Sequence, residues 1–110
     1  MNYSVVNDPE NGYGLVAQGE IEGDPLDESI RKWEFVVQWV EENHKRLDED
    51  GINTCALCIS VGCYTCPVRA RTGKMHCMGS PYYAYWGAAP WQKALEAAKA
   101  ELAFLKSIKE

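Results

Sequence analysis

Apolar side chains recur along residues 25–47 with the period of an α-helix. They follow one another at alternating steps of three and four positions, which places them in one stripe along a helix. The stripe consists of Ile30, Trp33, Val37, Val40 and Leu47, with His44 filling the one gap in the series. The pattern therefore predicts a helix over about residues 25–47 whose stripe packs against another helix.

The residues that flank this segment favour the same boundaries. Asp24 is a good N-cap residue, and Pro25 suits the first position of a helix. Gly51 follows an acidic run and is expected to end the helix or to lie just past its end. The first helix is thus expected within residues 24–50.

Residues 90–109 show the same period. Pro90 suits a helix start, and the apolar stripe consists of Trp91, Leu95, Ala98, Leu102 and Leu105. Two striped helices of similar length predict an antiparallel pair. We therefore expect a mostly α, single-domain protein with two antiparallel helices, at about 25–47 and 90–109.

Residues 1–23 form an N-terminal arm rich in Gly, Asn and Asp. Two short apolar pieces, residues 3–6 and 13–17, flank a segment that contains the turn dipeptide Asn11-Gly12. This arrangement favours a β-hairpin, whereas Pro9 and the length of the loop favour an irregular arm lying on the helices. The sequence leaves both possibilities open.

All five cysteines lie between the helices, in residues 52–89. They form two C-x2-C pairs and a fifth position: Cys55, Cys58, Cys63, Cys66 and Cys77. A C-x2-C pair on a tight turn brings two sulfurs to the separation that tetrahedral coordination needs, so two pairs predict a structural zinc site. The odd number of cysteines argues against a disulfide framework. We expect residues 52–89 to form a metal-binding knot that closes one end of the helix pair.

The choice of ligands and of metal stays open. Only four residues separate the two pairs, which is short for a zinc site, so Cys77 is an alternative fourth ligand in place of Cys55. His76 is a possible extra ligand. Four thiolates also bind a [4Fe–4S] cluster, and Cys66-Pro67 resembles the Cys-Pro that closes a ferredoxin motif. Zinc is the first expectation and the cluster is the alternative.

The cysteine-rich segment resembles small proteins common in tailed phages and prophages. The resemblance rests on CALC, CYTCPV and RTGKMHCMGSPYYAYW, which match a pattern of C-x-L-C, C-x2-C-P and Cys-x2-Ser/Thr-Pro-Tyr or -Trp. It covers about residues 54–86. The resemblance implies a phage origin and a core built by cysteines, and it implies no reaction.

Charge is unevenly distributed along the chain, which has a net charge of −5. Residues 1–54 contain 13 acidic and 4 basic side chains, whereas residues 55–110 contain 3 acidic and 7 basic ones. Basic and aromatic residues follow one another near the knot: Arg69, Arg71, Lys74, Tyr82, Tyr83, Tyr85 and Trp86. Such residues either bind a partner or, for the aromatics, cover the knot and the helix ends.

The sequence contains no paired carboxylates in an apolar setting, no phosphate-binding loop and no Ser-His-Asp set, so we expect a non-enzymatic protein. The leading hypothesis is a metal-binding interaction protein that binds a host or phage protein through its acidic arm or its aromatic loop. A nucleic-acid-binding module and an iron–sulfur redox or sensing protein are the alternatives. Without a signal peptide or an apolar run of membrane-spanning length, we expect a cytoplasmic monomer or dimer with no membrane contact.

Overall fold

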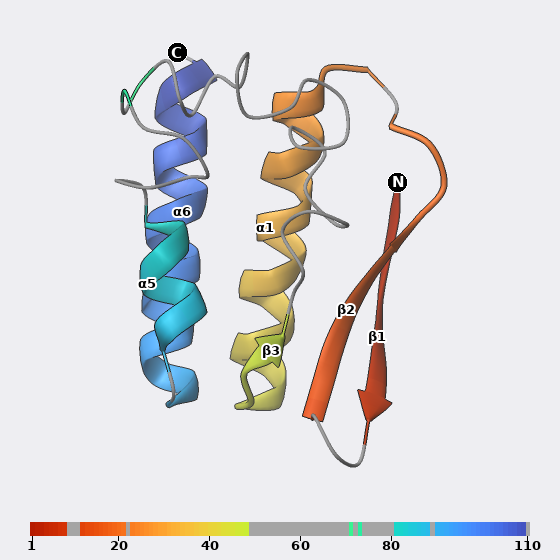
Figure 1. Cartoon of the computed structure of the whole chain (residues 1–110), viewed down its shortest axis with the longest axis vertical. Coiled ribbons are helices and arrows are strands. Elements are labelled where there is room, and N and C mark those ends of the chain that lie inside the picture. Colours follow the sequence, from red (N-terminus) through yellow and green to blue (C-terminus); the bar gives the residue numbers. More distant parts are fainter. Residues whose placement is uncertain are drawn as a thin grey trace.

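The computed structural model describes residues 1–8, 12–21, 23–48, 71, 73, 81–88 and 90–109. The elements are β1 (Asn2–Asp8), β2 (Gly12–Gln18), α1 (Pro25–Asn43), β3 (Leu47–Asp48), α5 (Tyr82–Gly87) and α6 (Trp91–Lys109). Helices account for 61% of the described residues. The described residues are therefore mostly α-helical, as expected, and they also form a small three-stranded sheet (Figure 1).

The two long helices, α1 and α6, lie side by side and run in opposite directions, as predicted (Figure 1). Each has 19 residues. Lys109 at the end of α6 pairs with Asp27 at the start of α1, and Trp91 at the start of α6 stacks on His44, 4.5 Å between ring centroids. Alanines at positions 94, 97 and 98 are buried and let the helices approach closely. Within the described ranges, no helix is long and apolar enough to cross a membrane.

The buried side of α1 contains most of the predicted stripe, namely Ile30, Trp33 and Val40, and Val36 widens it. Val36 and Val40 have no exposed surface, whereas Val37 is only partly buried at the edge of the helix pair. The core also contains Leu15, Leu26, Ile30, Trp33, Leu47, Tyr85 and Leu105. Burial of such side chains stabilises the fold by roughly 25 cal/mol per Å² of apolar surface. The core therefore lies between α1, α6 and the elements packed on them.

The predicted end of the first helix, at residue 47, is wrong. α1 ends at Asn43, because His44 adopts the left-handed conformation with φ 54° and its N–H donates to Val40 O at 2.9 Å. The chain then turns back, and Leu47 becomes part of β3. Leu47 is fully buried, so its apolar character was interpreted correctly, but it reaches the core from a strand.

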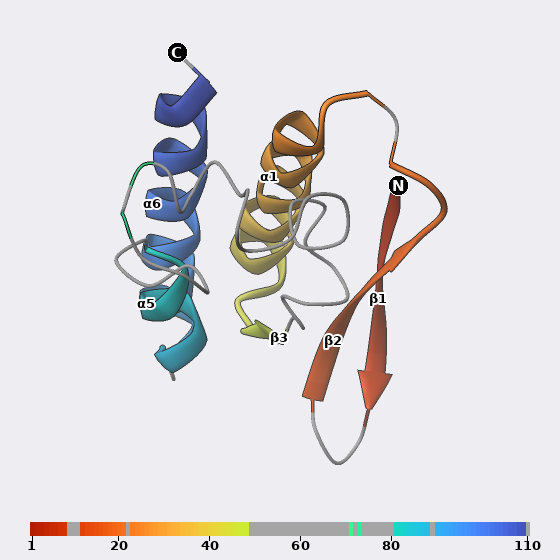
Figure 2. The same cartoon turned by 45° about the horizontal axis from the view of Figure 1, so that its top comes forward.

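The N-terminal arm is a β-hairpin, the first of the two possibilities that the sequence left open. β1 and β2 pair antiparallel with Val5 opposite Leu15, and β3 pairs parallel with β2 over two residues. One face of the hairpin lies against α1: the Tyr3 ring is 6.0 Å from that of Phe35, and the Tyr13 ring is 5.3 Å from that of Trp39. Consequently α1 lies between the hairpin and α6 (Figures 1 and 2).

Candidate protein-binding groove

The predicted metal ligands lie outside the described residues. This applies to all five cysteines and to His76: Cys55, Cys58, Cys63, Cys66, Cys77 and His76. In the part of the chain that is described, no group of three or more His, Cys, Asp or Glu side chains is arranged to hold a metal ion. The metal-binding knot therefore stays a prediction from the spacing of the cysteines.

Of the three basic residues next to the knot, Arg71 is described, and Arg69 and Lys74 are not. Its guanidinium Nη2 donates a hydrogen bond of 3.1 Å to Ser107 O, in the last turn of α6. The C-terminal end of a helix carries a partial negative charge and free carbonyl groups, so a cation is favourable there. Arg71 therefore has a structural partner within the protein.

Two of the predicted aromatic binding residues pack inside the protein. On α5, Tyr82 and Tyr85 meet the ring of Trp33 edge to face, at 6.1 and 5.1 Å between centroids. Tyr85 is only 1% exposed, and its hydroxyl donates to Leu47 O. The sequence left open whether Tyr85 binds a partner or packs inside the protein, and the structure shows packing, because a buried tyrosine with a satisfied hydroxyl belongs to the core. The side chains of Tyr83 and Trp86 lie outside the described part.

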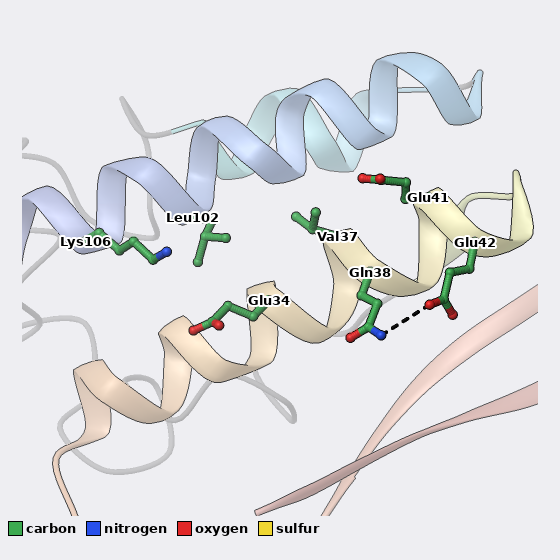
Figure 3. Close-up of a pocket in the computed structure, with 7 residues that line it drawn as sticks. All are labelled: Glu34, Val37, Gln38, Glu41, Glu42, Leu102 and Lys106. Carbon is green, nitrogen blue, oxygen red and sulfur yellow. Dashed lines mark hydrogen bonds between the residues drawn. The ribbon is translucent and has the colours of Figure 1, made fainter.

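An open groove of about 380 Å³ runs between α1 and α6 (Figure 3). It is lined by Glu34, Val37, Gln38, Glu41, Glu42, Leu102 and Lys106. Val37 from α1 and Leu102 from α6 point into the space between the helices, and both are partly buried. Glu34 and Lys106 lie toward one end, and Glu41 and Glu42 toward the other (Figure 3). The groove thus has an apolar floor and a charged rim.

The rim of the groove is acidic, with three carboxylates and one ammonium group. Glu41 lies 3.7 Å from Lys99, but both side chains are more than half exposed, so the pair is screened by solvent and worth little. Glu42 accepts a hydrogen bond of 3.2 Å from Gln38 Nε2. These groups are suited to binding a cationic segment that also inserts an apolar side chain. Sequence reasoning missed the groove because it assigned Val37 to the interior of the helix pair.

A second hollow, of about 460 Å³, lies where the hairpin meets the start of α1. At its base the Glu28 carboxylate is fully buried, 2.5 Å from the Met1 ammonium group and 3.0 Å from Arg31 Nε. Burial alone would raise the pKa of Glu28, but the hydrogen bonds from the ammonium group and from Arg31 outweigh it and hold the pKa below its usual value. This cluster fastens β1 to α1.

The resemblance to small phage proteins rests on about residues 54–86, of which only 71, 73 and 81–86 are described. The described residues therefore neither support nor contradict the resemblance. No family model, curated protein or solved structure matches this chain.

Proposed function

We propose that this chain is a small metal-binding protein without enzymatic activity, which acts by binding another protein through the groove between α1 and α6. The observation that carries the proposal is the composition of that groove: an apolar floor of Val37 and Leu102 beneath a rim of exposed glutamates. With a phage origin, as the resemblance implies, the place of action is the cytoplasm of the host cell.

The charge and shape of the groove specify the class of partner. Three glutamates and one lysine give the rim a net negative charge, which attracts a basic segment and disfavours an acidic one. The apolar floor between two antiparallel helices favours a partner helix that inserts one apolar residue per turn. We infer that the occupant is a basic amphipathic helix of a partner protein.

The cysteine spacing supports the metal-binding part of the proposal. Two C-x2-C pairs within residues 55–66 are the donor set of a structural zinc site, with Cys77 as an alternative ligand. In a small domain such a metal stabilises the fold, since metal binding and folding are coupled. An iron–sulfur cluster bound by the same thiolates is the alternative, and the absorbance spectrum of protein purified without oxygen distinguishes the two.

A synthetic peptide tests the groove directly. The probe is a helical peptide of about 15 residues, roughly four turns, with Leu on one face and Lys on the other. We expect it to bind the full-length protein in calorimetry at about 0.15 M salt, and to bind the variant E34K/E42K at least about tenfold more weakly. Both replaced side chains are exposed, so the fold is expected to tolerate the change.

The matched control is E20K/E96K, which changes the net charge equally at two exposed positions outside the groove. It should retain most of the peptide binding, and a peptide with the same composition in scrambled order should bind poorly. Equal weakening by the two double variants would mean that only net charge matters, and the groove proposal would then be wrong.

A further inference from the structure

The groove between α1 and α6 differs in charge between its two ends. Glu41 and Glu42 lie near the C-terminal end of α1, whereas Glu34 and Lys106 lie toward the C-terminal end of α6 (Figure 3). Among the lining residues, the first end therefore has two carboxylates, and the second has one carboxylate and one ammonium group. The lining side chains make one end acidic and leave the other close to neutral.

The acidic end keeps most of its charge. The last turn of α1 contains no basic residue. Lys99 lies 3.7 Å from Glu41, but more than half of each side chain is exposed, so solvent screens the pair. Glu42 accepts its hydrogen bond from a neutral amide group. The ammonium group of Lys45 donates to the hydroxyl of Tyr13, at 3.0 Å, and so lies on the hairpin side of α1.

Cations gather at the opposite end of the groove. Lys106 is exposed, and its ammonium group has no ion-pair partner within the described part of the chain. Lys109, in the same turn of α6, pairs with Asp27. The guanidinium group of Arg71 donates to Ser107 O, one residue from Lys106, and adds positive charge there. The surroundings therefore increase the difference in charge between the two ends.

The two ends are far enough apart to act separately. Glu34 and Glu42 are eight positions apart on α1, which is about 12 Å along a helix. At 0.15 M salt, charges at the surface are screened over about 8 Å. Each end of a bound helix therefore responds mainly to the charges at its own end of the groove. The dipoles of the antiparallel α1 and α6 oppose each other, so the side chains set the difference.

A helix that enters the groove has a polarity of its own. Its N-terminal end carries about half a positive charge and its C-terminal end about half a negative charge. The N-terminal end is therefore favoured at Glu41 and Glu42, and the C-terminal end at Lys106. Basic side chains select the same direction only when they lie in the N-terminal half of the partner helix.

We propose that the groove binds its partner helix in one direction, antiparallel to α1, with a basic N-terminal half at Glu41 and Glu42 and a C-terminal half without basic residues at Lys106. This inference rests on the proposed function, and it specifies the direction and the charge pattern of the helix that the groove recognises. The opposite direction would place the basic half of the partner against the cations at the end of α6.

A nitroxide label on a peptide reports the direction of binding. The probe is a helical peptide of about 15 residues with blocked ends and Leu on one face. Its other face has Lys in the N-terminal half and Gln in the C-terminal half. A nitroxide amino acid stands at the first or the last position, because a thiol-linked label would exchange with the cysteines of the protein.

The readout is the broadening of backbone amide NMR signals of the full-length protein. We expect the N-terminal label to broaden the signals of Glu41 and Glu42, and the C-terminal label those of Glu34 and Lys106. The contrast should correspond to a preference of at least about tenfold for this direction.

Exchanging two charges in the groove should reverse the direction. E42K/K106E keeps the net charge and the numbers of glutamates and lysines in the groove, but it makes the end at Glu34 acidic and the end at Glu41 neutral. Both replaced side chains are exposed, and circular dichroism checks that the fold is kept. We expect the two labels to exchange their broadening patterns.

The matched control is K93E/E96K, which exchanges a lysine and a glutamate at exposed positions of α6 outside the groove. It should leave the patterns unchanged. Labels that broaden both ends equally, an N-terminal label that lies at Lys106, or an E42K/K106E variant with the original patterns would overturn this inference and leave the groove as a binding site. A probe that does not bind would overturn the proposed function and this inference with it.

Discussion

Glu28 shows how a single buried carboxylate joins two elements. It is fully buried on α1, and it accepts hydrogen bonds from the Met1 ammonium group, directly before β1, and from Arg31. A buried charge without partners would cost several kcal/mol, so the two cations are needed for the carboxylate to stay ionised. Its lowered pKa therefore links stability to pH.

We expect Glu28→Gln to lower the free energy of unfolding by about 2 kcal/mol at neutral pH, because glutamine keeps the shape but loses the charged hydrogen bonds. A carboxylate with a lowered folded pKa stabilises the protein above its unfolded pKa, about 4.3, and this contribution is lost as pH falls through the folded pKa. Urea titrations at several pH values should thus show the difference from the unmodified protein shrinking in acid. Glu96→Gln, an exposed change on α6, is the control and should have little effect at any pH.

At the scale of elements, the end of α1 decides where the chain enters the sheet. His44 sits in the left-handed region, its ring stacks on Trp91 at an interplanar angle of 6°, and three residues later β3 begins. A left-handed residue terminates a helix, and glycine adopts this conformation at the lowest cost. The relative effects of alanine and glycine at this position therefore report the local backbone conformation.

Both His44→Ala and His44→Gly lose the stack on Trp91, so both should destabilise the protein. In the left-handed conformation alanine costs about 1 kcal/mol more than glycine, and we expect His44→Gly to be the more stable of the two. A helix continuing to residue 47 would reverse the order, because glycine inside a helix is about 1 kcal/mol less stable than alanine. Comparing the melting temperatures of the two variants therefore distinguishes a helix that ends at Asn43 from one that continues to residue 47.

For the molecule as a whole, the predicted metal site concerns residues 52–89, which lie between β3 and α6 and include α5. We expect a strong chelator at neutral pH to lower the melting temperature sharply, because metal-binding free energy is part of the folding free energy. Among single serine substitutions, those at Cys58, Cys63, Cys66 and Cys77 should abolish metal binding, whereas Cys55→Ser should retain it. Metal content by mass spectrometry of the purified variants checks both points.

Two outcomes would contradict this expectation. Metal-free protein that melts at the same temperature as the untreated sample would show that the fold does not depend on metal. Loss of metal on substitution of Cys55, with retention after substitution of one of the other four cysteines, would reverse the ligand assignment.

Local patterns along the chain were sufficient to predict the two long helices and their antiparallel order. The reason is that helices with a recurring apolar stripe are specified by local spacing, as in Ile30 and Trp33 on α1 and Ala98 and Leu105 on α6, all of which are buried. The cysteine spacing is equally local, and it predicts a metal site without reference to the fold. The hairpin was predicted only as one of two possibilities, because turn residues and short apolar pieces do not specify what a ribbon packs against.

The remaining features depend on contacts that form in the folded chain. Leu47 continued the helical period, but the left-handed turn at His44 moved it into a strand, and spacing alone does not distinguish the two routes to the core. The spacing of the aromatics allowed Tyr85 either to bind a partner or to pack, and its contacts with Trp33 and Leu47 place it in the core. The groove depends on how the two helices meet. Val36 is fully buried and its neighbour Val37 lines the groove, and the apolar pattern alone does not tell them apart. Such features arise from contacts between residues distant in sequence, and no local pattern encodes them.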